Sequence, residues 1–263
     1  MDDRFSVTSQ YATATNLRER MGLHERFSIH PTPWFRWVFE LLLALPPEAR
    51  ILEIGCGTGA LWRRNLERLP TGWRVTLTDA SEGMLATAQA ALAGHPAFSF
   101  SHQDAQALTF AEQSFDVVIA NHLLYHVPCV ADVLREVRRV LRPGGSLYAS
   151  TVGERNMHEL WTLAEQFAPG SIARAEQMVT KFTLENGAAQ LRRYFENVTL
   201  FPYEDALRVT EAEPLVAYLA STGIVWANET SDEARAFTAH LQAILADGAF
   251  DISKYQGVFC TQV

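Results

Sequence analysis

Between residues 50 and 152 the chain repeats one pattern, and this repeat constrains the fold more than any other feature of the sequence. Each repeat is a short apolar run, then a turn, then a segment in which apolar residues have helical spacing. Strands that alternate with helices are joined by right-handed crossovers, so we expect an α/β, doubly wound, mostly parallel sheet with helices on both faces. The apolar runs cover residues 50–54, 74–78, 97–101, 115–120 and 146–152, and the helical segments cover residues 61–69, 81–93 and 132–141.

Further helices are expected on both flanks of this pattern. In the N-terminal flank, helical spacing covers residues 16–27 and 34–45. A final pair of strands is expected over residues 198–203 and 252–260. Four consecutive segments follow from this: a helical N-terminal arm or lid, a binding core, a helical insertion that caps the ligand site, and a C-terminal part of the sheet domain with helices, over residues 1–49, 50–155, 156–195 and 196–263.

The composition indicates the cellular compartment and excludes some classes of binding partner. The 263 residues include 22 Lys and Arg against 30 Asp and Glu, a net charge of −8, so a phosphate backbone is repelled and no nucleic-acid partner is expected. The 3 cysteines do not make a disulfide framework, and the acidic start Met1-Asp2-Asp3 is unlike a signal peptide. The longest apolar stretch, residues 37–45, is short and contains Glu40, so no membrane span is expected. We therefore expect a cytoplasmic protein, and the sequence leaves its state as a monomer or homodimer open.

A glycine-rich turn follows the first predicted strand and opens a helix, with the sequence Glu53-Ile54-Gly55-Cys56-Gly57-Thr58-Gly59-Ala60. Glycines permit positive φ and let a ligand approach the backbone closely, and the following helix offers free N–H groups. The same loop also fits the pattern G-x-G-x-x-A of dinucleotide-binding proteins. A tight strand-to-helix turn without a ligand is a further interpretation, so the loop alone does not identify the ligand.

Two acids follow neighbouring strands, where ligands of such sheets bind. Asp79 ends the second strand, and its carboxylate suits the two hydroxyls of a ribose. The alternative is that Asp79 caps the helix that starts near Ser81. Asp104 follows the third strand and suits an exocyclic amine, the alternative being a solvated loop acid.

Taken in order, a series of motifs in this region resembles that of the class I S-adenosylmethionine-dependent methyltransferases. The resemblance covers about residues 45–152 and is greatest to the small-molecule branch, which includes the ubiquinone/menaquinone-biosynthesis type. It implies a Rossmann-like, seven-stranded sheet whose last strand runs antiparallel, and S-adenosyl-L-methionine as the cofactor. The motifs are Glu53-Ile54-Gly55-Cys56-Gly57-Thr58-Gly59, Leu77-Thr78-Asp79, Gln103-Asp104-Ala105, Phe115-Asp116-Val117-Val118-Ile119-Ala120-Asn121-His122 and Leu141-Arg142-Pro143-Gly144-Gly145.

The resemblance also implies which residues hold the cofactor. The loop glycines would border its methionine part, and the acid that ends the second strand would bind its ribose. A methionine in the next helix and the acid and alanine after the third strand would surround the adenine, and the asparagine after the fourth strand would meet the methionine end. The expected cofactor-binding set is Glu53, Gly55, Cys56, Gly57, Gly59, Asp79, Ala80, Met84, Asp104, Ala105, Asn121 and His122.

The charge of the expected site agrees with such a ligand. The loop contains no Lys or Arg, and acids lie nearby, which suits a sulfonium cation better than a diphosphate. Glu53 is expected to act on the ammonium group of the cofactor or through an intervening hydrogen bond. Asp116 lies early in its strand and is therefore expected to be structural.

The resemblance implies transfer of a methyl group to oxygen, nitrogen or carbon of a small organic acceptor by in-line displacement, for which positioning matters most. A base is needed only if the acceptor loses a proton, and His126 is the first candidate and His122 the second. A packing role is the alternative for both histidines. A metal site is not expected, because the two histidines lack a third ligand. The residues expected to contact the acceptor are Tyr11, Tyr125, His126, His158 and Trp161, for which packing is again the alternative.

Two other functions share parts of this pattern. A nicotinamide-dependent oxidoreductase would use the same loop and the acid at residue 79, but no Tyr-x-x-x-Lys pair follows the fourth strand. A non-catalytic module that binds S-adenosylmethionine would keep the whole pattern without turnover. The methyltransferase remains the function that the motifs favour.

Overall fold

The computed structural model of the chain describes residues 15–170, 180–227 and 231–263. Two compact units are present, and each is built from segments that are distant in the sequence. The sheet unit comprises residues 34–154, 180–203 and 256–263. The helical unit comprises the described residues within 1–33, 155–179 and 204–255.

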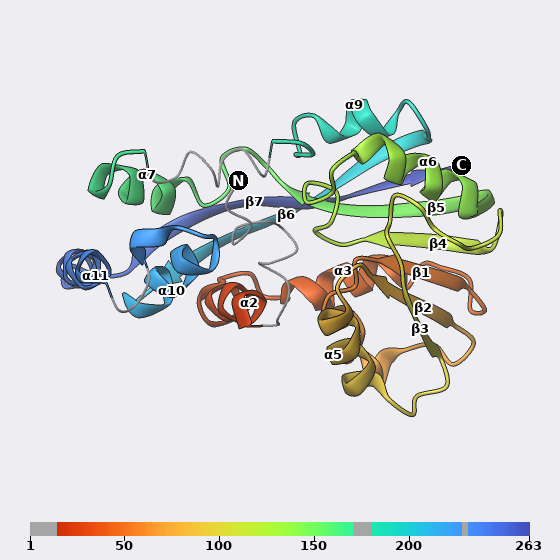
Figure 1. The fold of residues 1–263 in the computed structure, drawn as a ribbon, viewed down its shortest axis with the longest axis horizontal. Coiled ribbons are helices and arrows are strands. Elements are labelled where there is room, and N and C mark those ends of the chain that lie inside the picture. The colour runs from red at the N-terminus through yellow and green to blue at the C-terminus, as the bar shows by residue number, and fades with distance from the viewer. Residues whose placement is uncertain (1–14, 171–179, 228–230) are drawn as a thin grey trace. The chain divides into compact units, whose positions relative to one another are not determined.

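A seven-stranded sheet with the strand order β3-β2-β1-β4-β5-β7-β6 is the centre of the fold (Figure 1). The pairs β1–β2, β2–β3, β1–β4 and β4–β5 are parallel, and β7 runs antiparallel to β5. This confirms the predicted fold class and the antiparallel last strand. The strands are β1 (Arg50–Ile54), β2 (Arg74–Asp79), β3 (Phe98–His102), β4 (Phe115–Ala120), β5 (Leu141–Val152), β6 (Glu196–Val209) and β7 (Phe250–Gln262).

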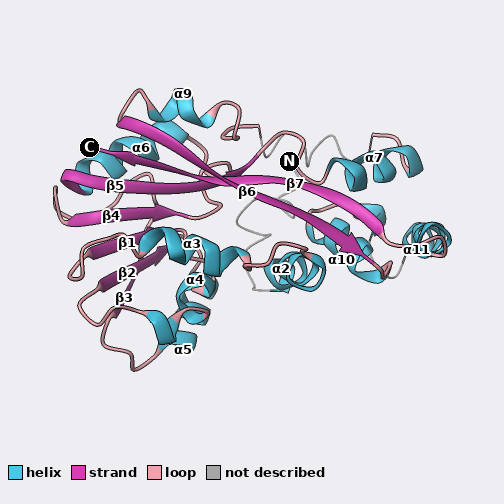
Figure 2. Ribbon diagram, turned by 180° about the vertical axis from the view of Figure 1, so that it is seen from behind, coloured by secondary structure: helices cyan, strands magenta, loops and turns pink. Residues whose placement is uncertain are grey.

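Helices cover both faces of the sheet within the sheet unit (Figure 2). Because side chains alternate along a strand, neighbouring residues of β4 join different cores. Val117 and Ile119 pack in a core with the helices α3, α4 and α5, whereas Val118 and Ala120 pack in a core with α6. The helices of the sheet unit are α3 (Trp34–Leu42), α4 (Ala60–Arg63), the 3-10 helix η2 (Leu66–Arg68), α5 (Glu82–Leu92), α6 (Val130–Val140) and α9 (Gly187–Leu191).

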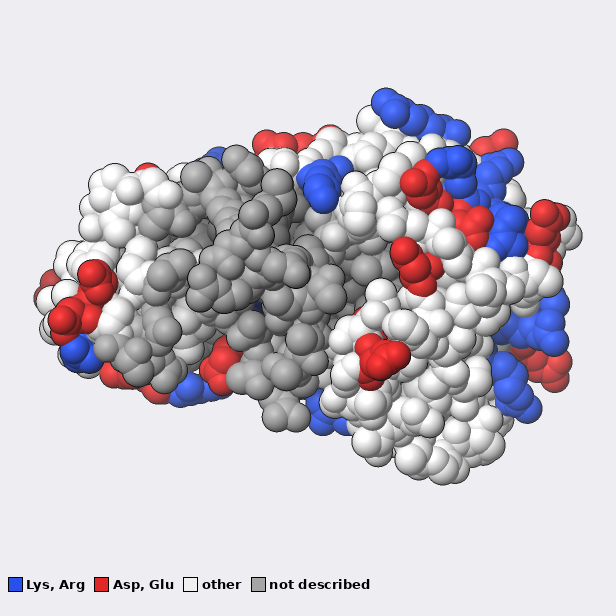
Figure 3. Space-filling view, in the orientation of Figure 1, with Lys and Arg blue, Asp and Glu red and all other residues white. Residues whose placement is uncertain are grey.

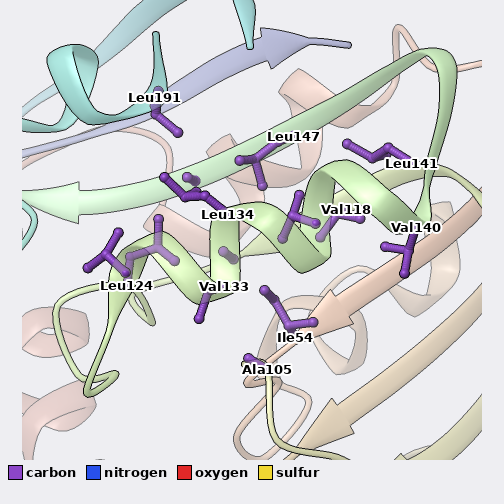
Figure 4. Close-up of a cluster of buried hydrophobic side chains, with 14 of the residues drawn as sticks. Ile54, Ala105, Val118, Leu124, Val133, Leu134, Val140, Leu141, Leu147 and Leu191 are labelled. Atoms are coloured by element: carbon purple, nitrogen blue, oxygen red, sulfur yellow. The ribbon is translucent and has the colours of Figure 1, made fainter. Parts of the chain in front are cut away.

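Helix α6 shows how an apolar stripe produces this packing. Its buried residues recur at helical spacing and include Val133, Leu134 and Val140. Figure 4 shows these side chains beside Val118 and Leu147 of the adjoining strands. Arg138 and Arg139 lie in the last turn of α6, where positive charge complements the helix dipole.

The helix predicted over residues 61–69 is wrong in its length, because it is divided into α4 and η2. The side chain of Asn65, which is fully buried, donates from Nδ2 to the carbonyl oxygen of Leu61 at 2.8 Å and to that of Phe35 at 3.0 Å. The Leu61 carbonyl is the one that the Asn65 N–H would reach in a continuous helix, and that N–H instead bonds Trp62 O. A tertiary contact with Phe35 therefore fixes the break.

The ends of other elements also differ from the expected ones. Helix α3 ends at Leu42 rather than at residue 45, since the chain tightens into turns before Pro46 and Pro47. Helix α5 begins as predicted, with Ser81 Oγ accepting from the backbone N–H of Met84 at 3.3 Å. Strand β5 begins at Leu141, before the Pro-Gly-Gly turn, and its pairing with β4 shifts register there. Strands β6 and β7 are longer at both ends than expected.

The helical unit has its own apolar core and one buried ion pair. The core includes Leu215, Leu219 and Phe237. Lys254 Nζ lies 2.9 Å from Asp205 Oδ2, and these side chains are 3% and 0% exposed. The helices of this unit are α2 (Thr15–Phe27), α7 (His158–Phe167), α10 (Glu213–Ser221), the 3-10 helix η3 (Val225–Ala227) and α11 (Asp232–Leu245).

The two units do not follow the four consecutive segments expected from the sequence, because residues 204–209 of β6 and 250–255 of β7 belong to the helical unit. The roles of a lid and a cap stay predictions. None of the helices within the described residues combines the length and the apolar character that crossing a membrane requires.

Candidate functional site

Four of the five predicted motifs reach the carboxyl ends of four adjacent strands, β3, β2, β1 and β4, and the fifth, at residues 141–145, lies at the start of β5. In the register of the sheet, Glu53 of β1 pairs with Leu77 of β2 on one side and with Ile119 of β4 on the other. The residues that directly follow these strands therefore share one edge. This edge is where parallel sheets bind ligands.

The glycine loop has the backbone conformation that its sequence predicts. Gly55 and Gly59 have φ angles of 65° and 68°, in the left-handed region. A Cβ atom on Gly55 would lie 2.6 Å from Leu123 Cδ1, and one on Gly59 would lie 3.2 Å from Ala88 Cβ. The left-handed conformation therefore favours glycine at these two positions, and a Cβ atom would also require Leu123 or Ala88 to shift.

The carboxylate of Asp79 connects the glycine loop to the start of α5. Its Oδ2 accepts from the backbone N–H of Gly57 and its Oδ1 from that of Ser81, each at 2.8 Å. The residue that caps α5 is Ser81 and not Asp79, because Ser81 Oγ accepts from the backbone N–H of Met84. A carboxylate has about four acceptor sites, so these contacts leave capacity for hydroxyl donors. Burial raises the pKa of Asp79 above 3.8, while these backbone hydrogen bonds act in the opposite direction.

Glu53 is buried beneath the loop, with 2% of its surface exposed. Its Oε2 accepts from the indole Nε1 of Trp62 at 2.6 Å. Burial raises the pKa of Glu53 to about 8, the Trp62 hydrogen bond lowers it, and the charge of Asp79 adds to the rise. The protonated form of Glu53 is therefore favoured at neutral pH, and the carboxylate is favoured once a cation lies beside it.

The sequence did not single out Trp62, whose indole N–H holds the Glu53 carboxyl group. Its position in the sequence, in the first helical turn after the glycine loop, could have indicated this contact, because that turn directs the Trp62 side chain back to the end of β1. Cys56, the loop cysteine, is buried, and burial raises its thiol pKa, with the charges of Glu53 and Asp79 adding to the rise. The loop thus combines acidic neighbours with a neutral thiol.

The expected adenine-side residues differ in burial. Met84 is buried at 1% exposure, and Ala105 lies at the edge of a core at 9%. Asp104 is exposed, and its Oδ1 accepts from the backbone N–H of Gln106 at 2.9 Å, as in the loop-acid interpretation. Ala80 follows Asp79, and its carbonyl oxygen lies 2.9 Å from His102 Nε2. Their roles toward a cofactor stay predictions.

Asp116 is held by structural contacts, as expected. Its Oδ2 accepts from the backbone N–H of Arg50 at 2.8 Å, and its Oδ1 accepts from Arg142 at 2.7 Å. It therefore connects the starts of β1 and β5. It belongs to the opposite edge of the sheet from the glycine loop.

The turn after β4 is organised by a buried serine. Ser150 Oγ donates to Asn121 Oδ1 at 2.6 Å and accepts from the backbone N–H of His122 at 2.8 Å. Ser150 is 2% exposed, and His122 has a φ of 52°, which is unusual for a residue other than glycine. With Oδ1 engaged by Ser150, the Asn121 amide N–H groups are the part that remains to bind a ligand. Ser150 was not expected from the sequence, because only the pairing of β4 with β5 places it there.

The two candidate bases lie in one group of rings. The ring centroid of Tyr125 is 4.3 Å from that of His126 and 6.2 Å from that of His122. His126 is positioned by a turn in which its backbone N–H donates to Leu123 O. The structure therefore brings His122, Tyr125 and His126 together. Their chemical roles stay predictions.

Further aromatic residues adjoin His122 within the sheet unit. The ring centroid of Trp34 lies 5.0 Å from His122 and 5.1 Å from Tyr203. Tyr203 belongs to β6 and is 2% exposed. Nothing in the sequence indicated this grouping, because β5 and β7 lie between β4 and β6 in the sheet and Trp34 is the ring that contacts both His122 and Tyr203.

The other expected acceptor residues are not part of this group. Tyr11 lies outside the described residues. His158 and Trp161 belong to α7 of the helical unit, where Trp161 packs 6.0 Å from Tyr218 and Tyr218 packs 5.7 Å from His24. Within the described part of the chain, no three His, Cys, Asp or Glu side chains are grouped to hold a metal ion.

Comparison with known proteins gives matches over the sheet unit and beyond. A family model described as a methyltransferase domain matches residues 52–149. The ubiquinone/menaquinone biosynthesis C-methyltransferase UbiE of Paracoccus denitrificans is 32% identical over 202 residues, which are 76% of this chain and 75% of that protein. The malonyl-[acyl-carrier protein] O-methyltransferase of Methylococcus capsulatus is 32% identical over 163 residues, which are 58% of this chain and 59% of that protein. The match thus spans less than two thirds of the Methylococcus protein's length.

Among solved structures, the [4+2]-cyclase SpnF superimposes with a TM-score of 0.62 at 18% identity, covering 97% of this chain and 94% of that one. At this identity the likeness concerns the fold. It extends over nearly the whole chain, beyond the region that the family model matches.

Proposed function

Because this chain belongs to the class I S-adenosylmethionine-dependent methyltransferases, we propose that it transfers a methyl group from S-adenosyl-L-methionine to a small organic acceptor. The observation that carries the proposal is the edge formed by β1, β2 and β4. There a glycine loop without basic side chains lies beside Glu53 and Asp79, an arrangement that favours a cationic nucleoside over a diphosphate.

Different residues of the sheet unit bind different parts of the cofactor. Asp79 accepts hydrogen bonds from the ribose, and Asn121 donates to the methionine end from the amide group that Ser150 orients. Glu53 faces the ammonium end, with Trp62 holding its carboxyl group. The remaining contacts come from the loop and from the adenine side, through Gly55, Cys56, Gly57, Gly59, Ala80, Met84, Asp104, Ala105 and His122.

The cofactor supplies an electrophilic methyl group on a sulfonium centre. The chain's own residues orient the acceptor in line with that centre and exclude water. Where the acceptor must lose a proton, His126 receives it, with His122 as the second candidate. The acceptor is a small molecule and the methylated atom is oxygen, nitrogen or carbon. The two named relatives methylate different atoms, so the comparison does not identify which atom this protein methylates.

We also propose a cytoplasmic location without a nucleic-acid partner. The net charge of −8 supports this. On the face seen in Figure 3, acidic and basic side chains are interspersed rather than gathered into a large basic patch. Some of the arginines are paired with acids, as in the ion pair of Arg139 with Glu136 at 2.6 Å.

Parallel calorimetric titrations with S-adenosylmethionine, S-adenosylhomocysteine and NAD test the proposal. We expect the first two to bind and NAD not to bind. Binding of NAD alone would instead support the oxidoreductase. A mass-spectrometric screen over many acceptors then separates an enzyme from a binding module, which would show affinity without any methylated product. In that screen, His126→Ala is expected to lose turnover and to keep its affinity for the cofactor.

A further inference from the structure

Four aromatic side chains of the sheet unit, Trp34, Trp37, Tyr203 and His122, form what we call the Trp34 cluster. The Trp34 ring stacks on Trp37 with a centroid distance of 5.5 Å and an interplanar angle of 29°. Tyr203 meets it edge-on at 5.1 Å and 87°, and His122 lies at 5.0 Å. The surroundings of Trp34 are thus flat and apolar on several sides.

The indole N–H of Trp34 is the polar group of this cluster that matters for ligand binding. The indole Nε1 of Trp34 is buried and has no hydrogen-bond partner among the described residues. Two other tryptophans of the sheet unit do have partners: Trp62 donates to Glu53, and Trp73 donates to the carbonyl oxygen of Pro46 at 2.9 Å. A buried donor without a protein partner costs free energy, so the Trp34 N–H is available to donate to a molecule bound beside it.

The position of this donor relates it to the reaction. His122, which adjoins Trp34, directly follows Asn121, the residue proposed for the methionine end of the cofactor. The His122 backbone has the left-handed conformation and is held by Ser150. The Trp34 ring therefore lies beside a turn whose geometry is fixed before any ligand binds.

We propose that Trp34 Nε1 donates a hydrogen bond to an oxygen atom of the methyl acceptor, and that the acceptor is a planar aromatic molecule carrying that oxygen. The rings around Trp34 favour a planar molecule. An N–H donor selects an oxygen that accepts hydrogen bonds and does not pair with an ammonium group, which only donates. This inference rests on the proposed function, because it takes the edge beside Asn121 as the place of methyl transfer.

Nuclear magnetic resonance of the indole N–H groups tests this directly in the full chain. The Trp34 resonance is assigned by its loss in Trp34→Phe. With S-adenosylhomocysteine already bound, 4-fluorophenol is expected to shift the Trp34 N–H resonance downfield, and fluorobenzene, which lacks the oxygen, is not. The phenol is expected to bind about five-fold more tightly than fluorobenzene, the effect of one net hydrogen bond.

The variants separate recognition from packing. Trp34→Phe keeps a ring and removes the unsatisfied donor, so its melting temperature is expected to be unchanged or higher, while its preference for the phenol is lost. Trp73→Phe, the matched control, removes a donor that already has a partner. It is expected to melt about 2–4 °C lower and to keep the preference.

Each contrary outcome has its own meaning. Absence of S-adenosylhomocysteine binding to the folded wild type would overturn the proposed function itself. Normal S-adenosylhomocysteine binding with no response of Trp34 to the phenol would overturn only the inference about the acceptor. A downfield shift on adding S-adenosylhomocysteine alone would also overturn it, because the donor would then serve the cofactor. A lower melting temperature with an unchanged preference in Trp34→Phe would leave Trp34 a packing role.

Discussion

The two units differ in how their buried carboxyl groups are paired. In the helical unit, the Asp205 carboxylate accepts from Lys254 at 2.9 Å, from Ser28 Oγ at 2.9 Å and from the backbone N–H of His30 at 3.1 Å. In the sheet unit, Glu53 and Asp79 are partly or wholly buried at one edge, and burial raises the pKa of each. A buried carboxylate that is paired with a cation and with hydrogen-bond donors stabilises the fold. A buried acid with a raised pKa can instead bind a cationic ligand.

The largest effect on stability is expected from breaking the buried ion pair between Asp205 and Lys254. Asp205→Ala leaves the Lys254 ammonium buried without its counterion, so the free energy of unfolding should fall by about 3–5 kcal/mol in urea titrations. The double variant with Lys254→Met should recover part of the loss, because the uncompensated charge is gone. Asp251→Ala, which breaks the exposed pair with Arg208, is the control and should change stability little. Equal losses in Asp205→Ala and Asp251→Ala would contradict the stabilising role of the buried pair in the helical unit.

In the sheet unit a smaller effect is expected, and it concerns the affinity for the cofactor rather than stability. Asp79→Ala removes the acceptor proposed for the ribose hydroxyls, so the dissociation constant for S-adenosylmethionine should correspond to a loss of roughly 1.5–3 kcal/mol. Calorimetry measures it, and a folded variant that binds as tightly as the wild type would exclude the ribose role. It would leave Asp79 as the connection between Gly57 and Ser81.

The raised pKa of Glu53 predicts a dependence on pH. Its stabilising contribution should be present in full below about pH 4.5, the unfolded value, and should be lost as the pH rises to about 8. Urea unfolding between pH 5 and pH 9 should therefore show a decline that Glu53→Gln, which stays neutral, lacks. The same slope in both proteins would assign the decline to another group.

Cofactor binding should respond to the same group with the opposite sign. If Glu53 faces the ammonium group, affinity for S-adenosylmethionine should rise by at most about ten-fold per pH unit up to pH 8. Titrations in two buffers that differ in ionisation enthalpy should show release of up to about one proton, which Glu53→Gln abolishes. Proton uptake on binding would contradict this role.

The smallest effect is expected at Ser150. Ser150→Ala removes the hydroxyl that holds Asn121 and His122, so affinity for the cofactor should weaken by about 1 kcal/mol, roughly five-fold. Ser150→Thr retains a hydroxyl and should recover most of the loss if the buried site accommodates its methyl group. A purely structural role would lower the unfolding free energy of Ser150→Ala and leave cofactor affinity unchanged.

The parts of this molecule that follow from local sequence were predictable, and the parts that depend on distant contacts were not. The order of β1 to β5 follows from the apolar runs, and the conformation of the glycine loop follows from glycines at positions with positive φ. The break after α4 escaped prediction because it depends on a hydrogen bond between Asn65 and Phe35, 30 residues apart. The same reason applies to Ser150, which reaches Asn121 across 29 residues through strand pairing.

The division into units was unpredictable for a related reason. Hydrophobic spacing identifies helices, but it does not tell which helices share a core. Helices were expected both before the last pair of strands and within residues 196–263, but the sequence did not indicate that α2, α7, α10 and α11 share one core. Only tertiary packing assigns them to one unit.

The interleaving of the two units also governs how relatives of this protein can be recombined. The chain passes from one unit to the other after residues 33, 154, 179, 203 and 255, and two of these passages fall within strands β6 and β7. A chimaera that exchanges the helical unit for that of another enzyme therefore requires several splice points, two of them inside the hydrogen-bonded ladder. Strand register would have to be conserved between the two parents before any new specificity could be transplanted.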